Sequence, residues 1–271
     1  MSSSTPNRID TTFARLKSES KTAFIAYVSA GDPDMPKSIE VIRALERAGA
    51  DIIELGVPFS DPMADGIVNQ MAAHRALEAG ATTIKVLELI REFRKESETP
   101  IVLFTYLNPI YTYGFKKFHK DAAAAGADGI LLLDLPPDEA GKNAEMTETG
   151  DLLHIRLIAP TTPAERLPEL AKSSEGFIYY VSRAGVTGAQ TSLSDNIAEN
   201  VAAIKAHTDL PVAVGFGIST PEQSAEVAKA AEGVVVGSAI VKQVEAYGAS
   251  DDLGDKIEAF VKPLVDGAKS V

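Results

Sequence analysis

Residues 211–238 read PVAVGFGISTPEQSAEVAKAAEGVVVGS, in which two short apolar runs flank a polar, alanine-rich stretch. The runs PVAVGF and EGVVVGS are rich in valine, which is typical of parallel strands that are buried on both faces. Between them, Thr220 is suited to cap a helix and Pro221 fits the first helical turn. The segment therefore predicts a strand, a covering helix and a second parallel strand.

The same alternation extends through the rest of the chain. Eight apolar runs can be counted: AFIAYVSA from Ala23, ADIIELG from Ala50, PIVLFTY from Pro100, DGILLLD from Asp128, LLHIRLIA from Leu152, GFIYYVS from Gly176, PVAVGF from Pro211 and EGVVVGS from Glu232. Two of the helices between them have readable ends, 37–48 closed by Gly49 and 116–125 before Gly126.

This pattern predicts an α/β protein, a single-domain (β/α)8 TIM barrel over residues 1–271 with extra helices at the N-terminus and at the C-terminal end. Residues 1–6 are expected to be a disordered tail. An open doubly wound sheet is the alternative fold. Its glycine fingerprint would follow the first strand, where this chain has SAGDP instead.

Composition limits the possible partners. The 271 residues carry a formal net charge of -12, which argues against nucleic acid or an anionic membrane as a partner because both are polyanions. There is no cysteine, so thiolate nucleophiles and cysteine-bound metals are excluded, and a reducing compartment suits the chain. The N-terminal MSSSTPNR lacks the apolar core of a signal peptide, and no apolar run is long enough to span a bilayer. We expect a cytoplasmic protein.

In a barrel of this kind the polar residues at the carboxyl ends of the strands form the site. Glu54 interrupts an apolar strand near that end, where loss of water would raise the pKa of its carboxyl toward the range useful for acid and base catalysis. Asp65 follows on a loop that Pro58 and Pro62 stiffen. We predict that Glu54 and Asp65 carry the chemistry, with a salt-bridged Glu54 as the structural alternative. Asp61 is expected to be structural, because its side chain can bond to nearby backbone and initiate a turn.

Two other chemistries lack the residues that they need. A Schiff base requires a lysine at a strand end, but the lysines lie on helices and connections, with Lys21 ahead of the first strand. A metal site requires clustered histidines and carboxylates, whereas the 4 histidines are expected on separate helices or early in a strand: His74, His119, His154 and His207. The sequence therefore predicts no metal site.

Glycine-rich loops follow the last three predicted strands: SRAGVTG, GFGIST and GSAI. Each alone could be only a tight turn, but together they match the phosphate site that such barrels build from these loops and a helix start. Backbone N–H groups bring no competing negative charge, and we expect donors from Gly188, Gly217, Gly237 and Ser238. The loop 182–190 suits a mobile lid, with an ordinary surface loop as the alternative. Arg183 either contacts the anion or supports this loop.

The chain as a whole resembles the α subunits of tryptophan synthase. The blocks that carry the resemblance follow the family's order over nearly the whole length: ELGVPFSDPMADG, TYLNPI, DLPP, IAPTTPAERL, YYVSRAGVTG, GFGIS and GSAIVK. The resemblance implies a lyase of tryptophan biosynthesis that cleaves indole-3-glycerol phosphate to indole and glyceraldehyde 3-phosphate. This is a retro-aldol reaction without a cofactor in this chain.

The resemblance also implies roles for single residues. Glu54 matches a residue that acts as acid and then base, and Asp65 matches one that accepts the indole N–H. Thr187 would bond to the aspartate when a lid closes. The implied substrate-binding residues are Tyr27, Tyr106, Tyr179, Thr187, Gly188, Gly217, Gly237 and Ser238. Three positions depart from the family pattern without removing a reacting group: Ser29, Met63 and Ala184.

A partner follows from the resemblance as well. It implies an α2β2 complex with a β subunit that holds pyridoxal phosphate, and we expect the docking face to include Pro58, Asp61, Met63, Asn108 and Pro109. Two alternatives stay open: a stand-alone lyase that releases free indole, and a non-catalytic activator of the β subunit. Phosphate-binding barrels that isomerise amino sugars share the glycine-rich rim but place their acid and base groups differently.

Overall fold

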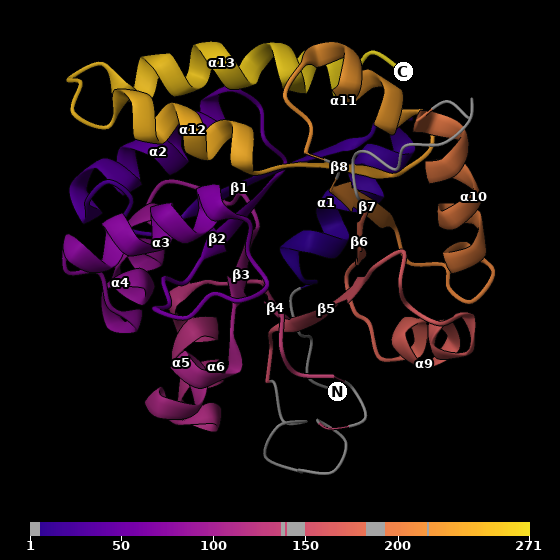
Figure 1. Cartoon of the computed structure of the whole chain (residues 1–271), viewed down its shortest axis with the longest axis horizontal. Coiled ribbons are helices and arrows are strands. Elements are labelled where there is room, and N and C mark those ends of the chain that lie inside the picture. Colours follow the sequence, from indigo (N-terminus) through magenta and orange to yellow (C-terminus); the bar gives the residue numbers. More distant parts are fainter. Residues whose placement is uncertain (1–5, 137–138, 140–149, 183–192, 216) are drawn as a thin grey trace.

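The computed structural model describes residues 6–136, 139, 150–182, 193–215 and 217–271, and it shows a closed barrel of parallel strands (Figure 1). The strands are β1 (Ala23–Ser29), β2 (Ile52–Gly56), β3 (Ile101–Thr105), β4 (Gly129–Leu132), β5 (Leu153–Ile158), β6 (Ile178–Val181), β7 (Val212–Gly215) and β8 (Gly233–Val236). Each pairs with the next, and β1 also pairs with β8, where Ala23 lies opposite Gly233. The barrel prediction is confirmed, and every strand falls within its predicted run.

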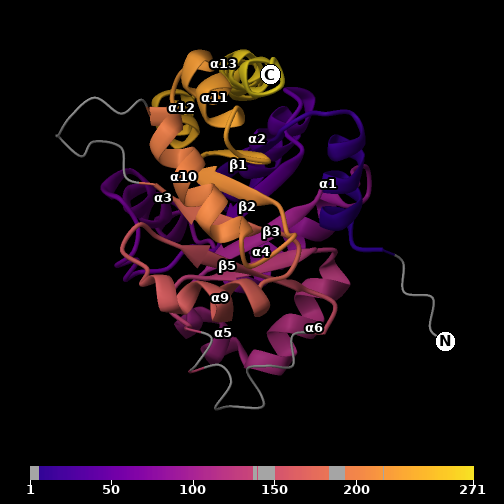
Figure 2. The ribbon, with the colours of Figure 1, turned by 90° about the vertical axis from the view of Figure 1, so that its right-hand side faces the viewer.

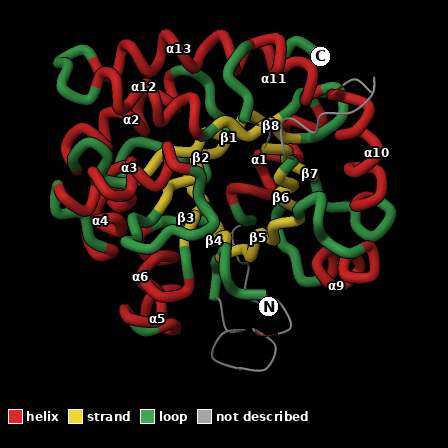
Figure 3. Tube along the Cα trace, in the orientation of Figure 1, coloured by secondary structure: helices red, strands yellow, loops and turns green. Residues whose placement is uncertain are grey.

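Helices form a ring around the strands (Figure 3). They are α1 (Arg8–Ser18), α2 (Met35–Arg47), α3 (Ile67–Glu78), α4 (Thr83–Phe93), α5 (Leu107–Tyr113), α6 (Phe115–Ala125), the short 3-10 helix η1 (Ala164–Arg166), α9 (Leu167–Lys172), α10 (Leu193–Lys205), α11 (Pro221–Ala228), α12 (Ser238–Tyr247) and α13 (Leu253–Ala268). The predicted extra helices are α1 and α13. The latter packs against α2 and α11, so the C-terminal end covers one side of the barrel.

The helix ends agree with the capping residues in the sequence. α2 begins two residues before the predicted start, because the side chain of Asp34 accepts a hydrogen bond from the backbone N–H of Lys37 (2.8 Å). Gly126 takes a left-handed conformation after α6 with φ of 100°. Thr220 caps α11 in a reciprocal capping box. Residues 1–5 of the expected tail lie outside the described residues, and the assignment of 1–271 to one domain stays a prediction.

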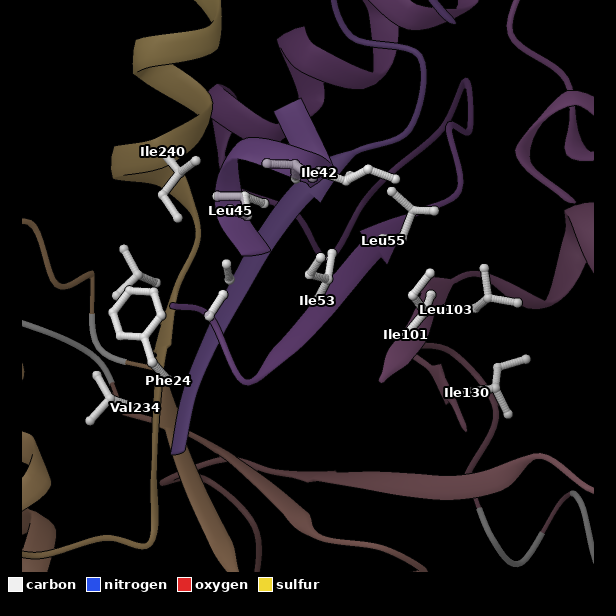
Figure 4. Close-up of a cluster of buried hydrophobic side chains, with 14 of the residues drawn as sticks. Phe24, Ile42, Leu45, Ile53, Leu55, Ile101, Leu103, Ile130, Val234 and Ile240 are labelled. Carbon is white, nitrogen blue, oxygen red and sulfur yellow. The ribbon is translucent and has the colours of Figure 1, made fainter. Parts of the chain in front are cut away.

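The outer face of each strand packs against the helices. Phe24 of β1 and Ile53 of β2 are fully buried and face Ile42 and Leu45 of α2 (Figure 4). Their continuous burial explains why the strand sequences are apolar on both sides of the sheet. The largest apolar cluster of the described residues lies in this layer.

The inner face of the strands forms a second apolar cluster. Ile25 and Ile52 belong to it, and α1 contributes Ile9, Phe13 and Leu16. This helix closes the barrel at the end where the strands begin (Figure 2). Because side chains alternate along a strand, the next inward positions toward the carboxyl ends are Tyr27 and Glu54.

A repeated contact ties the strands together where they begin. Shortly before each even-numbered strand, an acidic side chain accepts a hydrogen bond from a backbone N–H of the preceding strand: Asp51 from Phe24 (2.9 Å), Asp128 from Ile101 (2.8 Å), Glu175 from His154 (2.8 Å) and Glu232 from Val212 (3.0 Å). Asp128 also pairs with Arg8 (2.9 Å) and Arg94 (2.7 Å). Each of these carboxylates at the N-terminal end therefore has a structural contact.

Candidate active site

A cavity of about 440 Å³ lies at the carboxyl ends of the strands. Its walls come from the ends of β1, β3, β6, β7 and β8 and from the first turn of α3. The lining residues are Tyr27, Gly66, Ile67, Val68, Asn69, Phe104, Tyr179, Val181, Ser182, Gly215, Gly217, Val235, Gly237 and Ser238. The volume suits a small organic ligand.

Glu54 has unusual surroundings for an acidic residue. It lies beside Tyr27 in the β1–β2 register and is 0% exposed. Neither carboxyl oxygen has a hydrogen-bond partner among the described residues, and no described cation forms an ion pair with it, so the salt-bridged alternative is not observed. Burial raises the pKa of Glu54 to about 8. Such a carboxyl is mostly protonated at neutral pH and can donate its proton.

Asp65 is held at the same end by contacts from two elements. The hydroxyl of Tyr106 donates to its Oδ2 (2.8 Å) and accepts from the backbone N–H of Ala64 (3.0 Å). Gln70 donates from its side chain to the backbone carbonyl of Asp65 (2.8 Å). Burial raises the pKa of Asp65, whereas hydrogen bonds from the Tyr106 and Asn69 side chains lower it. The result is an oriented carboxylate beside the cavity.

Two tyrosines lie near both acids, as the effects of Glu54 and Asp65 on their pKa values show. Burial and the negative charges of Asp65 and Glu54 raise the pKa of Tyr27 well above its ordinary value. Burial, with Glu54 as the largest charge contribution, acts in the same direction on the pKa of Tyr179. Both tyrosines line the cavity, so Glu54 and Asp65 lie within electrostatic range of the same two hydroxyls. The predicted acids are therefore brought together at one end of the barrel.

Glycine makes room for both tyrosines. A Cβ atom on Gly56 would lie 2.6 Å from the hydroxyl oxygen of Tyr27, and one on Gly215 would lie 2.7 Å from that of Tyr179. No ordinary side chain fits at either position without displacing the ring. The last residues of β2 and β7 are thus glycine because the tyrosines lie against their backbone.

The opposite wall offers backbone donors. Gly217, with φ of +68°, follows β7, and Gly237 is the N-cap of α12 with no side-chain cap. Ser238 is the first residue of that helix, whose first N–H groups have no partner within the helix and whose dipole favours an anion. All three line the cavity. Thr187 and Gly188, together with Arg183 and Ala184, lie outside the described residues.

Comparison with known proteins assigns the family. The sequence profile described as "Tryptophan synthase alpha chain" matches residues 13–268. The chain belongs to the tryptophan synthase alpha chain family. The tryptophan synthase alpha chain of Citrifermentans bemidjiense is 48% identical over 261 residues, which cover 96% of this chain and 97% of the relative. That of Opitutus terrae is 47% identical over 264 residues, with coverage of 97% and 99%.

Solved structures of tryptophan synthase alpha chains have the same fold. The crystal structure of the alpha subunit from Legionella pneumophila str. Paris superposes with a TM-score of 0.86 at 40% identity, and covers 98% of this chain and 100% of that one. Tryptophan synthase from M. tuberculosis in its aminoacrylate-bound form gives 0.85 at 34% identity, with coverage of 97% and 100%. The resemblance stated from the sequence is confirmed.

Within this tryptophan synthase alpha fold, one residue of the expected docking face is misplaced. Pro58 is buried, because the backbone N–H of Val57 still donates to the carbonyl of Phe104 (2.9 Å) and extends the β2 pairing by one residue. The prediction that Pro58 lies on an exposed docking face is therefore wrong. Met63 is 92% exposed, and Asp61 and Asn108 are exposed as well.

Asp61 takes part in a turn through its backbone carbonyl, and not through its side chain as predicted. Its side chain accepts from the hydroxyl of Ser60 (2.6 Å), while its backbone carbonyl accepts from the N–H of Met63 (2.9 Å). Tyr106 was predicted to bind the substrate. Its hydroxyl bonds to Asp65, and like Glu54 and Asp65 it is not among the described residues that line the cavity.

The lysine and histidines for which the sequence predicted no catalytic or metal-binding role lie away from the cavity. Lys21 borders a hollow of about 470 Å³ at the opposite end, beside α1 and the starts of β7 and β8. His119 and His154 stack on each other in the core with ring centroids 5.8 Å apart. The described part of the chain holds no group of three or more potential metal ligands. None of the described helices is long and apolar enough to cross a membrane.

Several cavity residues were missed from the sequence. Phe104 lies edge-on to Tyr27 with ring centroids 5.0 Å apart. The alternation of inward positions in β3, Val102 and then Phe104, is the signal that points to it. Asn69 has no such signal, because its place depends on the path of the loop that precedes α3.

Proposed function

We propose that this chain cleaves indole-3-glycerol phosphate into indole and glyceraldehyde 3-phosphate, with Glu54 as acid and base and Asp65 as the acceptor for the indole N–H. The observation that carries the proposal is the fully buried carboxyl of Glu54, which has no described hydrogen-bond partner and whose pKa is raised to about 8. Membership of the tryptophan synthase alpha chain family supports this choice of substrate.

The reaction breaks one carbon–carbon bond and moves one proton. Protonated Glu54 gives its proton to C3 of the indole ring, and the positive charge develops on the ring nitrogen. The bond from C3 to the glycerol carbon then breaks, and its electron pair restores the aromatic ring. The hydroxyl on that glycerol carbon becomes the aldehyde as its proton passes to the Glu54 carboxylate. Glu54 is thus returned to its starting form.

Asp65 stabilises the charge that forms on the ring. Its carboxylate accepts the indole N–H, and it is already oriented by the hydrogen bond from Tyr106 (2.8 Å). Tyr27 and Tyr179 wall the indole beside the two acids. Thr187, from outside the described residues, would bond to Asp65 when the substrate is enclosed.

The phosphate binds across the cavity from the acids. Backbone N–H groups of Gly217, Gly237 and Ser238 supply donors, and Gly188 completes the proposed set. Each hydrogen bond to a charged acceptor contributes roughly 1.5–3 kcal/mol, which outweighs the screened repulsion of a distant surface charge. An acidic chain can therefore bind an anion without a lysine or arginine at this point.

The proposal extends to the partner. A β subunit with pyridoxal phosphate receives the indole in an α2β2 complex, and this chain itself needs no cofactor. Met63, Asp61, Asn108 and Pro109 are the proposed docking residues, and the large exposed fraction of Met63 supports this assignment. A chain without cysteine is suited to the cytoplasm, where we place it.

The test is to mix the purified chain with indole-3-glycerol phosphate, with and without a β subunit, and to follow indole and aldehyde together. We expect equal amounts of both products and faster turnover with the β subunit. Glu54→Gln should lower kcat by roughly 10²–10⁴-fold while the variant still activates the β subunit. High turnover alone, with no gain from the β subunit, would favour a stand-alone lyase. An unchanged rate in Glu54→Gln would remove Glu54 from this mechanism, whereas a wild-type chain that activates the β subunit but releases no indole would favour a non-catalytic activator.

A further inference from the structure

The first turn of α3 brings a polar side chain to the cavity that the proposed reaction does not use. Asn69 lines the cavity beside Val68, shortly after Asp65 in the chain. Its backbone N–H donates to the carbonyl of Gly66 (3.0 Å), which holds the residue at the start of the helix. Asn69 is therefore fixed between the Asp65 loop and the ligand space.

The two ends of the Asn69 amide have different surroundings. The Asn69 side chain lies near enough to Asp65 to lower the pKa of that carboxyl, and only the amide nitrogen can donate to a carboxylate. The amide oxygen is buried and has no partner in the part of the chain that the structure describes. A buried acceptor of this kind calls for a donor that the described residues do not supply.

Neighbouring contacts show that this end of α3 is built around Asp65. Gln70 donates to the backbone carbonyl of Asp65 (2.8 Å), and Tyr106 donates to its carboxylate (2.8 Å). Among these three described neighbours of Asp65, Asn69 is the one that also lines the cavity. It is therefore placed to contact Asp65 and a bound ligand together.

We propose that Asn69 is a positioning residue with two contacts: its amide nitrogen holds the Asp65 carboxylate, and its amide oxygen accepts a hydrogen bond from the bound substrate. This inference rests on the proposed function, which supplies a substrate with two glycerol hydroxyls as donors besides the indole N–H that Asp65 accepts. Glu54 and Asn69 then present acceptors to the donor-rich part of the ligand. Backbone donors face its phosphate at the other wall, so the cavity is complementary to both ends.

Two substitutions test the inference. Asn69→Leu removes both contacts with a side chain of similar size. Asn69→Asp keeps an acceptor but adds a negative charge beside Asp65. We expect kcat/KM of Asn69→Leu to fall roughly tenfold or more. The acid limb of its pH profile should move to higher pH, because Asp65 loses a bond that favours its charged form. Asn69→Asp should move that limb further in the same direction.

The other titratable groups that face this site are unchanged in both variants: Glu54 on β2, Tyr27 on β1, Tyr106 after β3 and Tyr179 on β6. An analogue that keeps indole and phosphate but lacks both glycerol hydroxyls identifies the substrate donor. If Asn69→Leu weakens inhibition by the analogue as much as it raises KM for the substrate, the proposed substrate contact of Asn69 is overturned, because the indole N–H is the donor to Asp65. If it raises KM alone, a glycerol hydroxyl is the donor.

Titration of the Asp65 carboxyl by NMR separates this inference from the proposed function. The control is His74→Gln, on the same helix with a side chain that is 61% exposed, and it should leave the Asp65 pKa and the kinetics unchanged. Identical Asp65 pKa and kcat/KM values in wild type and Asn69→Leu would overturn the inference. A wild-type chain that releases no indole would overturn the proposed function, and the Asp65 titration would still decide whether Asn69 holds the carboxylate.

Discussion

Asp51 and Asp128 at one end of the barrel and Glu54 toward the other end are buried acids with opposite surroundings. At the N-terminal end, Asp51 and Asp128 accept backbone hydrogen bonds and pair with cations. At the carboxyl end, Glu54 is more deeply buried and has neither kind of partner among the described residues. The first arrangement gives the acid hydrogen-bond and ion-pair partners and holds strands together. The second destabilises the charged form and keeps a proton on the acid, so burial alone does not decide what a carboxyl does.

The largest expected effect on stability is at the N-terminal end. Asp128→Ala leaves the side chain of Arg94, which is 9% exposed, without its carboxylate, and leaves the N–H of Ile101 without its acceptor. We expect the free energy of unfolding to fall by about 3–5 kcal/mol, as for a broken buried ion pair. Denaturant unfolding measures this loss. The folded variant should keep wild-type kcat and KM, and a large kinetic defect would contradict the division between the two ends.

At the carboxyl end, replacing the buried acid Glu54 should raise the free energy of unfolding instead of lowering it. The pKa of Glu54 is about 8 in the folded chain, against an ordinary value of 4.5. The folded state therefore keeps a proton that the unfolded state loses, and the free energy of unfolding falls as pH rises from about 4.5 to about 8. Glu54→Gln removes this dependence. At about 1.4 kcal/mol per pKa unit, the variant should be more stable than wild type by about 3 kcal/mol at pH 7.

The measurement is denaturant unfolding of both proteins across this pH range, with the exposed Glu88→Gln of α4 as the matched control. The stability gain of Glu54→Gln should grow with pH, whereas the control should follow wild type. A gain that is absent, or that shrinks as pH rises, would contradict the raised pKa. The same pKa predicts that kcat/KM declines above about pH 8, because the acid that protonates the indole is lost.

Smaller effects are expected when glycine is replaced by alanine at two depths of the barrel. A methyl group on Gly215 would lie 2.7 Å from the hydroxyl oxygen of Tyr179, at the cavity, whereas one on Gly233 would lie 2.8 Å from Cβ of Ala213, deeper in the barrel. Gly215→Ala should raise KM roughly tenfold. Gly233→Ala should instead cost about 1–3 kcal/mol of stability with little change in KM. Equal effects of the two variants on KM would show that the cavity and the deeper part of the barrel do not have separate roles.

Some of this arrangement follows from sequence patterns and some does not. The strands were predictable because buried parallel strands are continuously apolar, and Glu54 stands out as the acid that interrupts one. The burial of Pro58 was not, because it depends on one further backbone hydrogen bond after β2. The contact of Tyr106 with Asp65 joins residues from different loops, and no local pattern reports it. Tyr27 and Tyr179 were assigned through the family resemblance, since tyrosine in an apolar strand is common in any core.

Closure of the barrel by β1 and β8 has a consequence for how the chain is made. The first strand to leave the ribosome has its final neighbour in one of the last segments to be synthesised, since Ala23 pairs with Gly233. Until then β1 presents an unpaired edge that other nascent chains can join. A product truncated before residue 233 would leave that edge open permanently, so premature termination should yield aggregation-prone fragments rather than a smaller working protein.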